Sequence, residues 1–317
     1  MEIIILTLSL RYPFLKRFYF YLKKYIKSYI FHYGGPESVL DSLIRGFEQL
    51  KVNYHLNPKA KDISDIVCVI SGVDALKWAI ETKKHGKIKK IIAGPNIVIT
   101  PEDAGGILLD EVIDLVIVPS QWVKDFYASF KPGFGKKIRV WAAGVENPKD
   151  FKEELRQGCL VYKKNVDEEL FDFIINYLKS QNINYQVIKY GRYKKEKYFE
   201  ILNKVKFMIY LSESESQGLA LQEAWIRNVS TLVWDRGYWQ YKNYQWKDEK
   251  ISAPYLTDEC GMFFKGFNDF KEKFNIFISN LSNFKPREYS LRNFTDKVSV
   301  SNYLKIINEL LSKNYEK

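Results

Sequence analysis

The chain has 317 residues, of which 46% are hydrophobic and 27% charged, and its formal net charge is +11. This length and apolar content predict two globular domains of ordinary size and exclude an intrinsically disordered chain. The three cysteines lie far apart in apolar surroundings and the three histidines have no partner at metal-ligand spacing, so neither a disulfide framework nor a zinc site is expected.

In the first half, short apolar runs alternate with amphipathic stretches, which predicts parallel β-strands connected by helices. The expected strands are 2–10, 66–70, 91–93, 115–118 and 138–141, and the expected helices are 37–50, 73–84 and 120–130. The first apolar residues include Glu2 and lack a basic leading region, so they are interpreted as a strand rather than a signal peptide. No apolar run reaches 18 residues, so no membrane-spanning helix is predicted and a cytoplasmic protein is expected.

An aromatic and basic segment, residues 11–33, follows the first strand and contains six Lys/Arg, ten Phe/Tyr and no acidic residue. From Leu15 to Ile30 its apolar residues recur at helical spacing, which predicts an amphipathic helix. A basic helix with an aromatic face is typical of the membrane interface, and packing on its own domain with the lysines in water is the alternative. The residues expected to contact an anionic inner leaflet are Lys16, Arg17, Phe20, Lys23, Lys24 and Lys27.

The periodicity breaks at residues 144–158, where glycine, proline and a charged run predict the connection between two domains, 1–146 and 147–292. The second half repeats the α/β alternation. Its expected strands are 159–162, 186–190, 207–211 and 231–234, and its expected helices are 168–180, 195–204, 218–227 and 269–281. A last segment, 293–317, has apolar residues at helical spacing from Val300 to Leu311.

The richest motif is the polar loop that joins the apolar run 207–211 to a helix beginning near Gly218. It carries two carboxylates, Glu215 and Glu223, eight positions apart. The free N–H groups and the dipole at a helix start favour an anion, and carboxylates accept hydrogen bonds from sugar hydroxyls, so this corner suits a nucleotide sugar. The spacing alone also fits Glu215 as a loop charge and Glu223 on a solvated helix face.

This segment resembles the Glu-x7-Glu motif of the retaining "group 1" (family four-like) glycosyltransferases. Gly34-Gly35-Pro36 resembles the N-terminal glycine loop of that family, and Val118–Val123 resembles its strand end and helix cap late in the first domain. The resemblance covers most of the chain. It implies the GT-B fold, an α/β architecture with two Rossmann-like domains facing a central cleft, in which the last helix crosses back to the first domain.

By position, the resemblance also implies residue roles. Glu215 would lie beside the donor sugar and Glu223 would bind the ribose of the nucleotide. Gly34 and Gly35 would allow close backbone approach to the ligand, and Asn96 stands where many family members have a histidine. The turn expected to offer backbone amides to the donor comprises Ser216, Gln217, Gly218 and Leu219.

The leaving diphosphate needs positive charge, and no Asp-x-Asp pair stands at a strand end, so no metal is predicted and basic side chains would stabilise it. Lys163 matches the first basic position of the family. The second position falls on the acidic run 167–169, a departure for which Lys164 or Arg192 is expected to substitute. Solvated surface charges are the alternative interpretation of Lys163 and Lys164.

Together these features predict a metal-independent, retaining glycosyltransferase of hexosyltransferase type, with a nucleotide-sugar donor and a glycan or lipid-linked acceptor. It would be cytoplasmic and peripheral at the inner face of the membrane. A catalytically silent GT-B subunit and a nucleotide-sugar epimerase-like enzyme remain alternatives. Nucleic-acid binding is not predicted because only the net charge supports it, and a dinucleotide oxidoreductase is disfavoured because no Gly-x-Gly-x-x-Gly follows a strand.

The membrane interpretation predicts that the triple change Lys23/Lys24/Lys27→Glu abolishes flotation with anionic liposomes. Each cation near an anionic leaflet is worth about 1 kcal/mol, so three charge reversals would remove most of the attraction. Flotation equal to that of the unaltered protein would refute membrane docking by this segment.

Overall fold

The computed structural model describes residues 3–6, 34–58, 65–149, 151 and 155–312. The six residues predicted to contact the membrane lie outside these ranges. The chain forms two compact units, the first from β1 (Ile3–Leu6), Gly34–Gly144 and α11 (Asp296–Ser312), the second from Val145–Thr295. No helix in the described part of the chain combines the length and the apolar character needed to span a bilayer.

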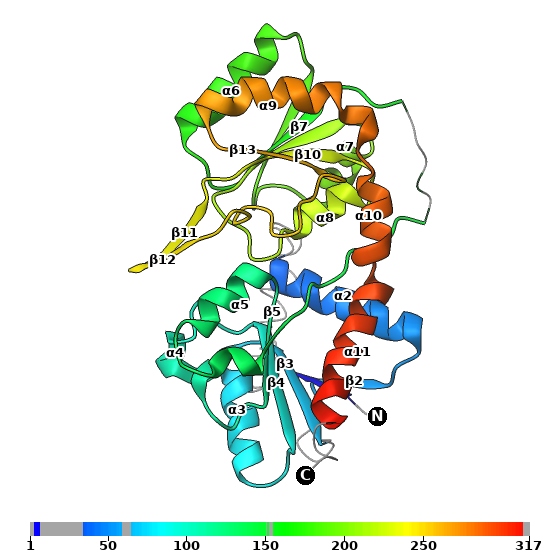
Figure 1. The fold of residues 1–317 in the computed structure, drawn as a ribbon. Coiled ribbons are helices and arrows are strands. Elements are labelled where there is room, and N and C mark those ends of the chain that lie inside the picture. Colours follow the sequence, from blue (N-terminus) through cyan, green and yellow to red (C-terminus); the bar gives the residue numbers. More distant parts are fainter. Residues whose placement is uncertain (1–2, 7–33, 59–64, 150, 152–154, 313–317) are drawn as a thin grey trace. The chain divides into compact units, whose positions relative to one another are not determined.

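The first unit contains a six-stranded parallel sheet in the order β2-β1-β3-β4-β5-β6 (Figure 1). After β1 its strands are β2 (Tyr54–Leu56), β3 (Ile66–Ser71), β4 (Lys90–Asn96), β5 (Leu115–Val118) and β6 (Ile138–Val140). Its helices besides α11 are α2 (Gly35–Leu50), α3 (Val73–Lys84), α4 (Asp103–Gly106), α5 (Gln121–Ala128) and the 3-10 turns η2 (Ile107–Leu109) and η3 (Phe134–Lys137). The central strands β3 and β5 are almost continuous runs of buried Val, Ile and Leu, as in parallel sheets covered on both faces.

The C-terminal helix α11 packs on the first unit. The buried ring of Tyr303 lies 4.8 Å from that of Trp141, and the Trp141 indole N–H donates to the Ser299 carbonyl over 2.9 Å. Arg45 of α2 binds both carboxylate oxygens of Asp296, at 2.7 and 3.0 Å. Since Asp296 is only 2% exposed, this bidentate pair compensates a charge that would otherwise be buried alone.

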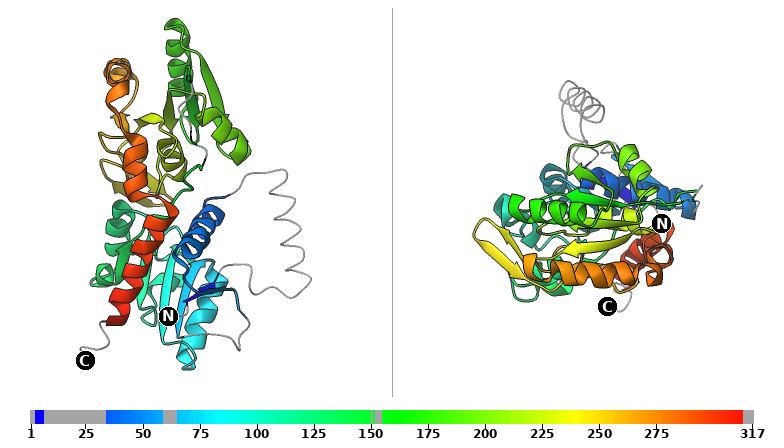
Figure 2. Two further views of the ribbon diagram at one scale, coloured as in Figure 1. Left: turned by 90° about the vertical axis from the view of Figure 1, so that its right-hand side faces the viewer. Right: turned by 90° about the horizontal axis from the view of Figure 1, so that it is seen from above.

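The second unit contains a five-stranded parallel sheet in the order β13-β10-β9-β7-β8. Its strands are β7 (Cys159–Lys163), β8 (Tyr185–Lys189), β9 (Phe207–Leu211), β10 (Ser230–Trp234) and β13 (Gly261–Phe264). Its helices are α6 (Glu168–Ser180), α7 (Lys195–Leu202), α8 (Leu219–Trp225), α9 (Phe267–Ser279), α10 (Pro286–Asn293) and the 3-10 turn η4 (Leu281–Asn283). An antiparallel hairpin of β11 (Tyr238–Tyr241) and β12 (Tyr244–Lys247) extends away from this sheet (Figure 2).

The two faces of this second sheet differ in chemistry. Val161 and Ile209 belong to a core of mainly aliphatic side chains and phenylalanines, which includes residues of α6 and α9. These two helices cover one face of the sheet (Figure 1). Because side chains alternate along a strand, the next residues, Tyr162 and Tyr210, point to the other face. There their rings stack 4.9 Å apart, and Tyr198 of α7 packs on Tyr162. The second unit thus has one apolar face and one tyrosine-lined face.

Most of the elements predicted from the pattern are present, and α3, α6, β5 and β9 have the predicted bounds. The prediction missed β2, β13, α10 and the β11–β12 hairpin. The edge strands β2 and β13 are only three and four residues long, so they give little periodic signal. The two parallel α/β sheets confirm the predicted fold class.

The contact between α2 and α11 generates a stability prediction. A Cβ added to Gly46 would lie 2.2 Å from Val300 Cγ2 and 2.6 Å from the Asp296 carbonyl oxygen. We expect Gly46→Ala to destabilise the protein by about 1–3 kcal/mol because backbone and packed side chain must both shift, which chemical denaturation would measure. Gly35→Ala, in the same helix with nothing within 4 Å, is the matched control and should change stability little. Equal stability of the two variants would contradict this packing.

Candidate functional site

The polar candidates of the second unit gather where its strand order reverses. If the strands are numbered along the chain from β7, they lie side by side in the order 2-1-3-4-5. The connection after β7 therefore leads to the neighbour on one side, β8, and the connection after β9 leads to the neighbour on the other side, β10. Ligands of open α/β sheets bind at such switch points. Lys163 and Lys164 stand at the end of β7, and the Glu215 loop follows β9.

Glu215 is a buried carboxylate held by three donors on one oxygen. Its Oε1 accepts hydrogen bonds from the Tyr210 hydroxyl at 2.6 Å, the Ser212 hydroxyl at 3.0 Å and the Lys164 ammonium at 2.8 Å. Its backbone N–H donates to the Ile251 carbonyl over 2.9 Å. Both the carboxylate and the backbone of Glu215 are therefore fixed, which excludes the alternative of a solvated loop charge.

Lys164 is the counter-charge of Glu215. Its ammonium also lies 4.7 Å from the centre of the Tyr190 ring. Burial opposes the charged form of Lys164, but the Glu215 carboxylate and the hydrogen bond to it raise the pKa of Lys164 above its ordinary value. The lysine is thus kept cationic at the end of β7.

Glu223, in α8, forms an ion pair with Lys195 of α7, whose ammonium lies 2.7 Å from Oε1. The Glu223 side chain is 13% exposed, and in the described part of the chain no donor binds its Oε2. Burial lowers the pKa of the neighbouring Arg227, and the Glu223 charge opposes this. Glu223 therefore lies beside two cationic side chains, Lys195 and Arg227, with one carboxylate oxygen still able to accept a hydrogen bond.

Tyr193 belongs to the tyrosine-lined face and is affected by the charge of both carboxylates. Its hydroxyl lies 2.6 Å from the Tyr162 hydroxyl, and its ring packs on that of Tyr198. Burial raises the pKa of Tyr193; the hydrogen bond with Tyr162 opposes this, and the charges of Glu223 and Glu215 reinforce it. The charges of both carboxylates thus act on this one phenol of the tyrosine-lined face.

Lys163 does not join this group of contacts. It is buried, its ammonium pairs with Glu168, and it lies 3.9 Å from the centre of the Phe171 ring. Glu168 belongs to the acidic run that replaces the second basic position of the resembled family. The acidic residue found where the resembled family has a second basic residue therefore serves as the ion-pair partner of Lys163.

The predicted amide turn is compact. Gly218 has a φ of +85°, where a side chain would be strained, and precedes α8, which has seven residues. Ser216 is exposed, whereas Gln217 is buried and donates to the Gln222 side chain over 2.8 Å. The Gln222 amide nitrogen is fully buried and has no acceptor in the described ranges.

The other predicted site residues are more scattered. Arg192 is exposed in the turn after β8. Gly34 is the N-cap of α2 in the first unit and Gly35 is its first residue. A Cβ added to Gly35 would have no atom within 4 Å. Asn96 ends β4, and its amide nitrogen is buried without an acceptor among the described residues.

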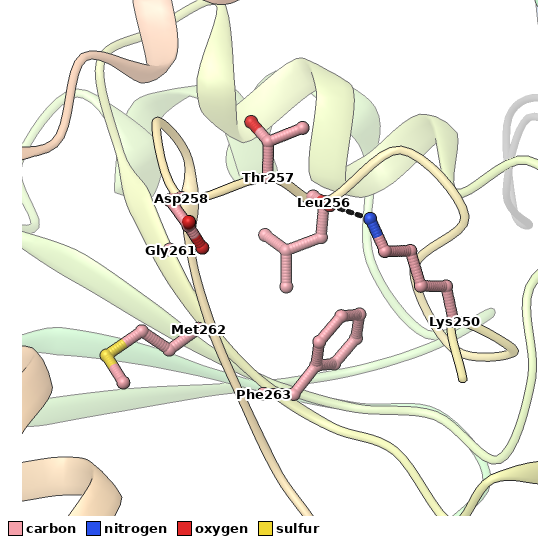
Figure 3. Close-up of a pocket in the computed structure, with 7 residues that line it drawn as sticks. All are labelled: Lys250, Leu256, Thr257, Asp258, Gly261, Met262 and Phe263. Carbon is pink, nitrogen blue, oxygen red and sulfur yellow. Dashed lines mark hydrogen bonds between the residues drawn. The ribbon is translucent and has the colours of Figure 1, made fainter.

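A separate open pocket of about 330 Å³ borders the edge strand β13 (Figure 3). Leu256 and Phe263 point into it, and the Lys250 ammonium donates to the Leu256 carbonyl over 3.2 Å. None of the predicted site residues lines this pocket. No group of three or more His, Cys, Asp or Glu side chains arranged to hold a metal ion occurs in the part of the chain that the structure describes.

Several residues of this site were not predicted from the sequence, among them Tyr210, Ser212 and Lys195. Tyr210 carried a usable signal, because a tyrosine on the alternate face of an apolar strand, five residues before a glutamate, needs a polar partner. Lys195 carried none, because its pairing with Glu223 depends on how α7 packs beside α8.

The similarities to known proteins lie at the level of structure. No family model and no curated protein matches the chain. The apo form of the lipopolysaccharide outer core galactosyltransferase WaaB is 15% identical, with a TM-score of 0.62 over 98% of this chain and 99% of that one. Sucrose-phosphate synthase from Thermosynechococcus elongatus is 10% identical, with a TM-score of 0.53 and the same coverages.

TarM is 16% identical, with a TM-score of 0.52 over 78% of this chain and 56% of its own. At such identities the likeness shows the fold. The chain has the two-domain, Rossmann-like GT-B fold that the sequence predicted.

The contacts of Glu215 generate a second prediction. Tyr210→Phe should destabilise the protein by about 1.5–3 kcal/mol, because it removes a short hydrogen bond to a buried carboxylate. Tyr289→Phe is the control, because its hydroxyl donates over 3.1 Å to the neutral carbonyl of Tyr255, and it should cost about 1 kcal/mol. Denaturant unfolding of both variants is the measurement, and a Tyr210 effect no larger than that of Tyr289 would show that Glu215 does not depend on this donor.

Proposed function

We propose that the protein is a glycosyltransferase whose second unit binds a nucleotide-sugar donor at the carboxyl ends of β7 and β9. The observation that carries this proposal is the pair of largely buried carboxylates, Glu215 beside Lys164 and Glu223 beside Lys195, in the segment that follows β9 at the switch point of a GT-B fold. Glu223 has an oxygen, Oε2, with no donor among the described residues, so it can accept from a hydroxyl, and a nucleotide sugar supplies hydroxyls on both its ribose and its hexose.

In this proposal Glu223 accepts from the ribose through its Oε2. Glu215 faces the donor sugar, and the turn from Ser216 to Leu219 supplies backbone N–H groups to the phosphates. The φ of Gly218 supports this role of the turn, because it allows the backbone to come close to a ligand.

The charge on the leaving diphosphate falls to Lys164, with Lys163 and Arg192 as further candidates. Lys164 is held cationic beside Glu215, and its ammonium has further N–H groups beyond the one that Glu215 accepts. Lys163 would have to exchange Glu168 for phosphate. Arg192 is exposed and would have to turn toward the ligand.

The proposed reaction is metal-independent and retaining, with a glycan or lipid-linked acceptor. The acceptor hydroxyl attacks the anomeric carbon from the face that the phosphate leaves, and the departing phosphate oxygen takes the hydroxyl proton. This route needs no side-chain base, which fits Asn96, whose amide cannot take a proton at neutral pH. Roles of Gly34, Gly35 and Asn96 in donor binding, and membrane contact by residues 11–33, stay predictions.

A catalytically silent GT-B subunit is the second candidate, favoured by the lysine that already neutralises each carboxylate of the motif. Such a subunit would bind the donor without turning it over. Release of nucleoside diphosphate from a nucleotide sugar, alone or with a lipid-linked acceptor, separates the two candidates, because only the enzyme releases it.

The donor site is tested by thermal unfolding with UDP, GDP, ADP and their hexose conjugates. We expect at least one of them to raise the unfolding midpoint of the unaltered protein. Glu223→Ala should weaken its binding about tenfold or more, because a hydrogen bond to a charged group is lost. Glu200→Ala, an exposed glutamate of α7, is the matched control and should leave binding unchanged. Full retention of the ligand-induced shift by Glu223→Ala would refute the ribose assignment.

A further inference from the structure

Lys195 is a residue of this site that no motif pointed to. It begins α7, and its ammonium lies 2.7 Å from Oε1 of Glu223 in α8. Its side chain is 28% exposed, and that of Glu223 is 13% exposed. The pair therefore lies at the rim of the tyrosine-lined face, partly accessible to a ligand.

The pair offers one acceptor and several donors side by side. Glu223 Oε2 has no donor within the described ranges, and the Lys195 ammonium, which forms an ion pair with Oε1, carries three N–H groups. Two adjacent hydroxyls on one ring match this arrangement, since one can donate to the carboxylate while the oxygen of the other accepts from the ammonium.

We propose that Lys195 and Glu223 together recognise the 2′,3′-diol of a ribonucleoside diphosphate. This inference rests on the proposed function and adds to it a specificity-determining residue: Lys195 makes the site prefer ribonucleotides over 2′-deoxyribonucleotides. Glu223 alone could bind a single remaining hydroxyl, whereas the ammonium beside it keeps only its Glu223 partner and loses the ribose acceptor when one hydroxyl is missing.

A purely structural ion pair between α7 and α8 would have different consequences. Partly exposed lysine–glutamate pairs contribute little to stability, and α7 and α8 are also joined by the Tyr198 hydroxyl, which donates to the Ala220 carbonyl over 2.6 Å. The connection between the two helices thus does not require Lys195.

The test compares ribonucleoside diphosphates with their 2′-deoxy forms. The full chain is titrated calorimetrically with UDP, GDP or ADP, whichever binds, and with the matching 2′-deoxynucleotide. The variants are Lys195→Met, Lys195→Arg and Lys197→Met, the last a control on the same helix whose partner is the exposed Glu200. Unfolding midpoints without ligand establish that each variant is folded.

We expect the unaltered protein to prefer the ribonucleotide about tenfold or more, since a charge-assisted hydrogen bond is lost with the hydroxyl. Lys195→Met should remove most of that preference while the 2′-deoxynucleotide binds nearly as before. Lys195→Arg should keep part of it, and Lys197→Met all of it.

Two failures have distinct meanings. If the unaltered protein binds none of the nucleotides, the proposed function is wrong and this inference falls with it. If Lys195→Met binds both sugar forms more weakly by the same factor, or keeps the full ribose preference, the proposed function stands and Lys195 does not recognise the diol.

Discussion

A carboxylate taken out of water needs donors or a counter-charge, and this requirement organises the second unit. Glu215 would be costly to bury alone, and the chain supplies a tyrosine, a serine and a lysine to a single one of its oxygens. Concentrating the donors on Oε1 keeps the carboxylate group in one orientation. The same requirement explains Lys195 beside Glu223. Each of the two carboxylates thereby has a lysine partner near the carboxyl ends of the strands.

The place of these carboxylates at the ends of the strands follows from the alternation of side chains along β7 and β9. One set of residues, including Val161 and Ile209, completes the apolar core under α6 and α9. The other set contains Tyr162 and Tyr210, which are apolar along the ring and polar at the tip. A tyrosine can therefore belong to the packed interior and still offer a hydroxyl to a carboxylate at the strand end. The hydrogen bond from the packed Tyr210 side chain thus helps to fix the position of Glu215.

The fold could be predicted from sequence because parallel strands buried on both faces leave continuous apolar runs, such as Ile66–Ile70 and Phe207–Leu211. The positions of Glu215 and Glu223 could be predicted because they lie in one local segment. The pairing of Lys195 with Glu223 could not, because it joins residues 28 positions apart through the packing of two helices. Nor could local reasoning tell which of the adjacent Lys163 and Lys164 meets Glu215, because a one-residue step along a strand decides the face.

The acidic run at 167–169 shows how a departure from a motif can be compensated inside a fold. If Glu168 had replaced a basic residue with no other change, a donor phosphate would meet added negative charge at the start of α6. Instead Glu168 pairs with Lys163, while Lys164 and Lys195 pair with the two motif carboxylates. These three lysines thus have glutamate partners before any ligand binds.

A phosphate that enters such a site exchanges partners with ion pairs instead of finding isolated cations. Exchange costs less than separating a pair into water, because the ammonium keeps an anionic partner throughout, and the released carboxylate must find a donor on the ligand. A nucleotide sugar offers both kinds of group, phosphate oxygens that bind the lysines and hydroxyls that donate to the glutamates. A simple anion such as inorganic phosphate offers only the phosphate oxygens. Paired charges therefore favour a ligand that carries anionic and hydroxyl groups on one molecule.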